Sequence, residues 1–304
     1  MGIGYREINP GFGAEVAGMG LARPFTPEEE ADLVALVARY GVCVFRDTGL
    51  TDATHIWFSR MFGNLWTVPG KSRFAFPQLF EAGNLTAEGT ISTDEMARSR
   101  RRGDRLWHTD SSFTQARTTY SLLLAHEVPD AGGATCFADA RGAWEALPPA
   151  MQQRIEGLRA EHSYFWSRRQ AGYPVTPEQI ANGPKATHPL VHVHPGSGRK
   201  SLYIAAHAMR IVGLDDAEGQ ALIAELLAFA TQPQFTFTHH WRPGDLVIWD
   251  NFATLHRGAD YDDATQRRDL RRTTVFAWPP PPVVLDPRFA DRFDPEQFRA
   301  MVQA

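Results

Sequence analysis

The sequence predicts a mainly β protein with inserted helices, built as a double-stranded β-helix (a cupin-like jelly roll) in a single domain over residues 1–304. Short runs rich in β-branched and aromatic residues recur from Leu106 onward, and helical patterns interrupt them at only a few places. No internal repeat is visible. Barrels and sandwiches often exceed about 200 residues as one domain, so the length is compatible with this fold.

The first helix is predicted from its capping pattern. Thr26 precedes an acidic first turn at 28–30, and apolar residues follow at helical spacing until Gly41 ends the pattern. A short strand at 42–46 should come next.

Residues 66–105 have no clean hydrophobic period, carry scattered Gly and Pro, and include a basic run at 98–102. We predict a long loop or lid region here. A solvated irregular connection and a functional lid are both open readings of this segment.

The second half of the chain alternates strand patterns with a few helices. Helices are predicted at 149–158 and 217–230, and an extension at 279–304 starts a short helix near Asp294. The predicted strands are 120–126, 135–138, 190–194, 201–205, 235–240, 246–249 and 271–278.

Composition narrows the class of partner. Hydrophobic residues make up 43% and charged residues 22% of the chain, as in ordinary globular proteins. A formal net charge of -4 gives no electrostatic reason to expect nucleic acid or an anionic membrane. No apolar run reaches the length of a membrane span, and no signal peptide is visible. The charge therefore favours a small soluble ligand. Cys43 and Cys136 each lie in an apolar run, which indicates buried free thiols in a reducing compartment, with a disulfide between them as the alternative, so we expect a cytoplasmic protein. We also expect a homo-oligomer, with the proline-rich tail available for a subunit contact.

One short motif carries metal-ligand chemistry. His108 and Asp110 are two residues apart, and on a strand such residues face the same side. His256 follows a predicted late strand and can supply a third ligand. Two histidines and one carboxylate leave one face of an octahedral ion open, as in non-haem iron(II) oxygenases. The same donor set also serves catalytic zinc.

Two arginines follow the third candidate ligand, His256. If this segment is extended, Arg268, Leu270, Arg272 and Thr274 share one face of a strand. Buried guanidinium groups without anionic partners are very costly. Two carboxylate ligands in the interior would neutralise them.

These motifs together resemble the TauD/TfdA family, most closely its 2,4-dichlorophenoxyacetate dioxygenase branch. The resemblance covers residues 14–278 in order. Its motifs are LWHTDSSF at 106–113, GGAT at 132–135, GLRAEH at 157–162, GSGRK at 196–200, HRG at 256–258 and RDLRR at 268–272.

The resemblance implies an enzyme that uses Fe(II), O2 and 2-oxoglutarate and releases succinate and CO2. His108, Asp110 and His256 match the metal ligands of the family. Thr135 and Arg268 match the positions that bind the far carboxylate of 2-oxoglutarate, and Arg272 matches the position that receives the acidic group of the substrate. The carboxylate at 110, where related halogenases have a small residue, implies hydroxylation.

The expected substrate is a small carboxylate-bearing molecule, either aryloxyalkanoate-like or a natural-product acid, and a taurine or alkylsulfonate is the alternative. One extra residue between His256 and Arg268 leaves Arg267 as an alternative partner of 2-oxoglutarate. Lys71 can supply a second cation for the substrate, or can be a solvated loop lysine. A zinc hydrolase and a non-enzymatic acid-binding barrel are the rival functions. His192 and His194 are expected to be structural, since no carboxylate lies near them in the sequence.

Overall fold

The computed structural model describes residues 3–67 and 73–276. Two predictions therefore lie outside the described residues: the role of Lys71, and the extension at 279–304 with its terminal helix. No helix among the described residues is both long and apolar enough to cross a membrane.

The N-terminal part holds a hairpin of β1 (Gly4–Asn9) and β2 (Phe12–Ala17), then α1 (Pro27–Tyr40), β3 (Val42–Phe45) and α2 (Asp52–Arg60). The predicted first helix is confirmed in detail. Thr26 and Glu29 form a reciprocal capping box, and Gly41 adopts φ 73° after the last turn. The hairpin and α2 were not predicted.

The remaining elements follow in chain order. They are β4 (Phe80–Glu81), α3 (Glu95–Asp104), β5 (Thr118–Glu127), β6 (Thr135–Asp139), α4 (Ala140–Ala146), α5 (Pro149–Ile155), β7 (Arg159–Ser163), α6 (Tyr164–Gln170), α7 (Pro177–Asn182), β8 (Lys185–Pro189), β9 (Val191–Val193), β10 (Lys200–Leu202), β11 (Ala208–Ile211), α8 (Asp216–Ala230), a 3-10 turn (Pro233–Phe235), β12 (Thr236–His239), β13 (Leu246–Asp250), β14 (Thr254–Gly258) and β15 (Asp269–Phe276).

Two sheets form the centre of the molecule. A seven-stranded sheet has the order β1-β2-β3-β13-β5-β15-β4, and a three-stranded sheet has the order β12-β6-β14. The chain passes between them repeatedly, since β5 is followed by β6, and β13 by β14 and then β15. The prediction of a sheet-rich protein with inserted helices is confirmed.

A hydrophobic core lies between the two sheets. Val247 and Trp249 of β13 meet Phe137 of β6 and Phe237 of β12 in this layer. The intervening residues of β13, Leu246 and Ile248, point to the opposite face of the seven-stranded sheet. Because both faces of the strand are buried, its sequence is a continuous apolar run rather than an alternating one.

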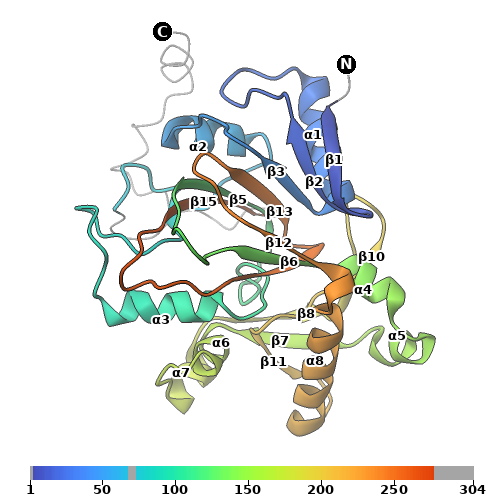
Figure 1. Ribbon diagram of the computed structural model, residues 1–304. Helices are drawn as coiled ribbons and strands as arrows, with labels where there is room; N and C mark the ends of the chain where they lie inside the picture. The colour runs from blue at the N-terminus through green and yellow to red at the C-terminus, as the bar shows by residue number, and fades with distance from the viewer. Residues whose placement is uncertain (1–2, 68–72, 277–304) are drawn as a thin grey trace.

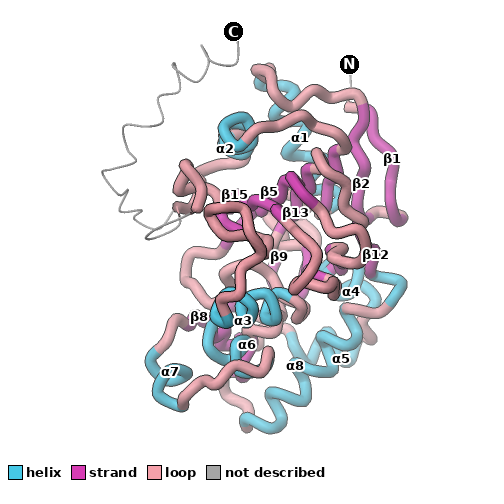
Figure 2. The backbone as a smooth tube through the Cα atoms, turned by 60° about the vertical axis from the view of Figure 1, so that its left-hand side comes forward, coloured by secondary structure: helices cyan, strands magenta, loops and turns pink. Residues whose placement is uncertain are grey.

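Helices cover the outer faces of the sheets. Residues of α1 and α2 pack on the far side of the seven-stranded sheet, and α4 and α8 pack on the far side of the three-stranded sheet. Figures 1 and 2 show α1 and α2 at one end of the molecule and α5 to α8 at the other. The central strands lie between these groups.

The region 66–105 differs from its prediction in one respect. Its described residues are largely irregular, as predicted, but the basic run lies on α3 rather than in a loop. Arginine is a good helix former, so a basic run without apolar periodicity is still compatible with a surface helix. The two cysteines are free, as predicted, with Cys43 buried and Cys136 partly exposed.

Candidate active site

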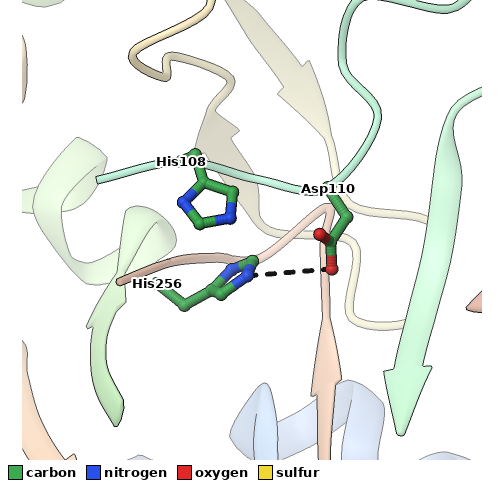
Figure 3. A group of neighbouring side chains, drawn as sticks. All are labelled: His108, Asp110 and His256. Atoms are coloured by element: carbon green, nitrogen blue, oxygen red, sulfur yellow. Dashed lines mark ion pairs between the residues drawn. The ribbon is translucent and has the colours of Figure 1, made fainter. Parts of the chain in front are cut away.

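Three predicted metal ligands meet between the two sheets. One ligand atom from each of His108, Asp110 and His256 lies within 4.8 Å of the others, and all three residues are buried. His256 Nε2 is 3.7 Å from Asp110 Oδ2, and the two imidazole rings are 4.2 Å apart between centroids. Figure 3 shows the three side chains pointing toward one another.

The two histidines are neighbours because their backbones pair. His108 N donates to His256 O at 2.9 Å, and His256 N donates to His108 O at 2.8 Å. This is an isolated antiparallel bridge, so His108 and Asp110 lie on a short extended segment rather than on a regular strand, and their side chains still converge. The extended segment ends at Ser111, which has φ 53° and begins a turn.

The protonation states of the ligands suit a cation. Burial, together with the neighbouring His108, lowers the pKa of His256 well below its usual value, so this imidazole is neutral. Burial alone would raise the pKa of Asp110, but Arg272, the two neighbouring histidines and the Ser121 hydrogen bond together outweigh it and hold this pKa below its usual range. Neutral imidazoles and an anionic carboxylate are the forms that bind iron(II).

A hydrogen-bond network orients Asp110. Ser121 Oγ donates to Asp110 Oδ2 at 2.6 Å, and Asn251 Nδ2 donates to Ser121 Oγ at 3.1 Å. The Asn251 Oδ1 atom accepts from Asp110 N at 3.0 Å and from Trp249 Nε1 at 3.2 Å. Asn251 is 1% exposed and Ser121 is fully buried. The carboxylate therefore has little freedom to turn away from the two imidazoles.

The first histidine is oriented as well. His108 Nδ1 lies 2.7 Å from Leu106 O, which leaves its Nε2 free to bind an ion. Ligand type, burial, charge state and orientation all fit a divalent cation. These residues form the floor of the site, and we call His108, Asp110 and His256 with Ser121 and Asn251 the metal-binding floor.

Arg268 lies in the same cavity without a carboxylate partner within salt-bridge distance among the described residues. Its Nη1 donates to Ala82 O and its Nη2 to Gly133 O at 3.5 Å, and its Nε is buried without a hydrogen-bond partner. Arg267 points outward and forms an ion pair with Glu127, with Nε 2.5 Å from Oε1. Of the two candidate arginines, only Arg268 lines the cavity.

Thr135 is close to the same part of the cavity wall. It is 4% exposed, and its Oγ1 accepts from Trp241 Nε1 at 3.0 Å. A hydroxyl that accepts one hydrogen bond still has its own proton to donate. A buried guanidinium that lacks an acid, beside a hydroxyl donor, fits a carboxylate ligand.

Arg272 is the second arginine of the predicted pair. Its Nη1 donates to Asp110 Oδ1, and its guanidinium lies over the ring of Phe80 at 4.9 Å. Arg268, Arg272 and Thr274 all line the cavity, as expected for one strand face, whereas Leu270 is fully buried in the core between the sheets.

The cavity above the floor has a volume of about 600 Å³. Its walls are rich in aromatic rings: Trp66, Phe74, Phe80, Phe113, Tyr164, Trp249, Tyr261 and Phe276. Phe74 and Tyr164 line the cavity, whereas the neighbouring aromatics Phe76, Phe165, Trp166 and Tyr173 do not. We call the described residues 66–67 and 73–105 the wall segment.

The sequence reasoning missed several residues of the site. Asn251 stands two residues after the predicted strand 246–249, but nothing in the sequence links it to Asp110. His194 was expected to lack a carboxylate, and this is wrong: its Nε2 is 2.8 Å from Asp250 Oδ2. Both residues of that pair are buried, so the bond ties the β9 region to the end of β13.

Comparisons with known proteins agree with this geometry. The family model described as "Taurine catabolism dioxygenase TauD, TfdA family" matches residues 4–274. An alpha-ketoglutarate-dependent 2,4-dichlorophenoxyacetate dioxygenase of Burkholderia sp. (strain RASC) is 40% identical over 91% of this chain and 95% of its own. An (S)-phenoxypropionate/alpha-ketoglutarate-dioxygenase of Sphingobium herbicidovorans is 35% identical over 88% of this chain and 93% of its own.

A solved structure gives the same result. The crystal structure of AAD-2 in complex with Mn(II) and N-oxalylglycine superposes with a TM-score of 0.86 at 36% identity, covering 91% of this chain and 98% of AAD-2. The predicted reaction class is confirmed by these relatives: the enzyme is a non-haem dioxygenase that depends on Fe(II), 2-oxoglutarate and O2. The chain belongs to the TauD/TfdA family of dioxygenases.

Proposed function

We propose that this enzyme hydroxylates an aryloxyalkanoate-type acid. His108, Asp110 and His256 are its proposed metal ligands, Arg268 and Thr135 hold the far carboxylate of 2-oxoglutarate, and Arg272 receives the acid group of the substrate. The observation that carries this proposal is the unpaired Arg268 beside the three converging ligand side chains. A zinc hydrolase needs the three ligands but has no use for a buried guanidinium without an acid.

The protein's part in the reaction is binding and orientation. When bound, iron and 2-oxoglutarate would use O2 as the oxidant, with one oxygen atom going to succinate as CO2 is released and the other hydroxylating the substrate. Ser121 and Asn251 hold Asp110 in place, and the backbone bridge holds the two histidines. The guanidinium of Arg268 presents planar donors that match a carboxylate.

Arg272 is suited to the acid group of the substrate. It lies over Phe80 and donates one hydrogen bond to the Asp110 carboxylate, and among the described residues its buried Nε has no hydrogen-bond partner, so the guanidinium can donate to a second anion. The aromatic walls favour an aryl group over a taurine-like chain, because ring faces contribute dispersion and apolar area. Relatives named for phenoxy acids support the same class.

Hydroxylation at the carbon beside the ether oxygen would give a hemiacetal, which collapses to a phenol and an aldehyde or keto acid. The test is a panel of aryloxyacetates, aryloxypropionates, alkylsulfonates and aliphatic acids, each measured for stimulated succinate release and O2 uptake. The expected result is stimulation by aryloxy acids with one phenol released per succinate. Preference for alkylsulfonates would overturn the substrate proposal. Hydrolytic activity with Zn(II) in the absence of 2-oxoglutarate would overturn the proposed reaction class.

We also propose that the two facing sheets form a double-stranded β-helix in one domain. The alternation of β5, β6, β13, β14 and β15 between the sheets supports this topology. The cytoplasmic location and the homo-oligomeric state of the enzyme stay predictions.

A further inference from the structure

Tyr261 has a buried phenol that no other feature of the site explains. Its side chain lines the same cavity as Arg268 and Thr135. Its hydroxyl is buried and has no hydrogen-bond partner among the described residues. A buried hydroxyl without a partner costs free energy, and most such groups in native proteins are satisfied by protein, water or ligand.

The backbone around Tyr261 is fixed next to the predicted 2-oxoglutarate site. Gly133 N donates to Asp260 O at 3.0 Å, and Ala259 N donates to Ala134 O at 2.8 Å. Gly132 has φ 77°, and a side chain there would collide with the Asp260 carbonyl and the Tyr261 backbone. The loop after β14 therefore lies directly against the loop that leads into Thr135.

The charges around this phenol favour an anion. The Arg268 guanidinium carbon is 5.9 Å from the centre of the Tyr261 ring. Arg101 and Arg105 also act on the phenol, but they are paired with Asp263 and Asp260.

The phenol itself stays protonated. Burial raises the pKa of Tyr261 above its usual value, in spite of the nearby Arg268. The hydroxyl is therefore a neutral donor with a free proton, beside a guanidinium with a free Nε.

We propose that Tyr261 donates a hydrogen bond to the far carboxylate of 2-oxoglutarate, as a third donor beside Arg268 and Thr135. This inference rests on the proposed function, since it requires 2-oxoglutarate in this cavity. If the ring served packing alone, phenylalanine would replace it without loss. The hydroxyl is thus the group to test.

The experiment compares Tyr261→Phe with the wild-type enzyme, both loaded with Mn(II) and kept free of O2. Binding of N-oxalylglycine, an analogue of 2-oxoglutarate, is followed by tryptophan fluorescence and by the rise in melting temperature. Loss of one hydrogen bond to a carboxylate should weaken this binding about tenfold or more. A second ligand, 2-oxopentanoate, carries a methyl group where 2-oxoglutarate has its far carboxylate, and its affinity should be the same in both proteins.

Tyr203→Phe is the matched control, because the buried Tyr203 hydroxyl also has no hydrogen-bond partner within 3–67 and 73–276, but Tyr203 does not line the cavity. It should bind N-oxalylglycine like the wild type. Unchanged binding by Tyr261→Phe, or equal weakening for both ligands, would overturn the role of Tyr261 and leave the proposed function intact. Failure of the wild type to bind N-oxalylglycine would instead reject the proposed function, and this inference with it.

A second measurement does not depend on the variant's folding. In a crystal structure of the wild-type complex with Mn(II) and N-oxalylglycine, the Tyr261 hydroxyl should lie within about 3.0 Å of a far carboxylate oxygen. A separation beyond about 4 Å without a bridging water would contradict the proposal.

Discussion

The metal-binding floor and the wall segment are built in different ways. On the floor, Asp110 and Asn251 are 4% and 1% exposed; Asp110 N donates to Asn251 Oδ1 at 3.0 Å, and Asp110 Oδ2 accepts from Ser121 Oγ at 2.6 Å. The wall segment is largely irregular and half-exposed, and it is tied to the rest by ion pairs such as Arg73 Nη2 to Asp269 Oδ1 at 2.5 Å and Arg101 Nε to Asp263 Oδ2 at 3.0 Å.

This difference separates two tasks within one cavity. Metal chemistry depends on sub-ångström placement, which buried networks provide. Substrate choice depends on the shape of a surface, and an irregular segment changes shape without disturbing the sheets. Substitutions on the floor should therefore change the affinity for the metal, while substitutions in the wall segment should change the KM for the organic substrate.

The largest expected effect is on the floor itself. Asp110→Asn keeps the shape of the side chain but removes the charge that a divalent cation needs. We expect activity to fall more than about 100-fold, beyond the loss typical of groups that only support a ligand. Iron content after anaerobic loading and desalting should fall in parallel. Retention of both within tenfold of the wild type would contradict the ligand assignment.

The next effect concerns a group that acts through a ligand. Ser121→Ala removes the 2.6 Å hydrogen bond to Asp110, and we expect the affinity for Mn(II) or Fe(II) to fall about 10- to 100-fold. Ser59→Ala is the matched control, since Ser59 is also fully buried and lies 2.6 Å from Thr273 Oγ1, outside the site. The control should lose roughly 1–3 kcal/mol of stability without a change in metal affinity. Equal metal affinities in the two variants would show that Ser121 has a purely structural role.

A smaller effect is expected in the wall segment. Phe80→Ala removes a ring that contacts Arg272 and Trp66, and should raise the KM for an aryloxy acid about tenfold. The KM for 2-oxoglutarate should stay the same. Phe76→Ala lies in the same segment but does not line the cavity, so it should leave both constants unchanged. A rise in the 2-oxoglutarate KM alone would erase the distinction between the two regions.

The smallest effect is on stability as pH changes. Burial lowers the pKa of His55, His162 and His192 to about 3, whereas an unfolded histidine titrates near 6.5. The folded state thus binds fewer protons between these values, so stability is full above pH 6.5 and falls as the pH drops toward 3. Each group contributes a slope of about 1.4 kcal/mol per pH unit.

Urea unfolding at pH 7.5 and pH 5.5 measures this slope, and His55→Gln should flatten it. The wall segment has no histidine, so the effect reports on the packed interior. An identical slope in His55→Gln would mean that this imidazole is not held neutral by burial.

The sequence predicted features that depend on local pattern. Spacing and residue type predicted the capped helix after Thr26 and the strand β13. They also predicted that Arg268 and Arg272 face the interior. The convergence of His108, Asp110 and His256 followed from donor chemistry and family resemblance. The backbone at His108 and Asp110 was not predicted, because a single bridge and the turn at Ser111 stand in place of a regular strand.

Contacts between distant residues could not be predicted. Asn251 reaches Asp110 across 141 positions, and Asp250 reaches His194 across 56. Asp250 and Asn251 follow the predicted strand 246–249, and polar residues at such a place are equally typical of an ordinary turn. The α3 helix was missed since its arginines show no apolar period, and it is fixed instead by ion pairs to the loop after β14.

The paired backbone bonds between His108 and His256 have a practical consequence. They set the spacing of the two imidazoles through main-chain hydrogen bonds. A chelator should therefore remove the metal without unfolding the protein, and added cobalt(II) or manganese(II) should then bind at the same three side chains. Such exchange would make the centre accessible to spectroscopic probes that ferrous iron does not allow.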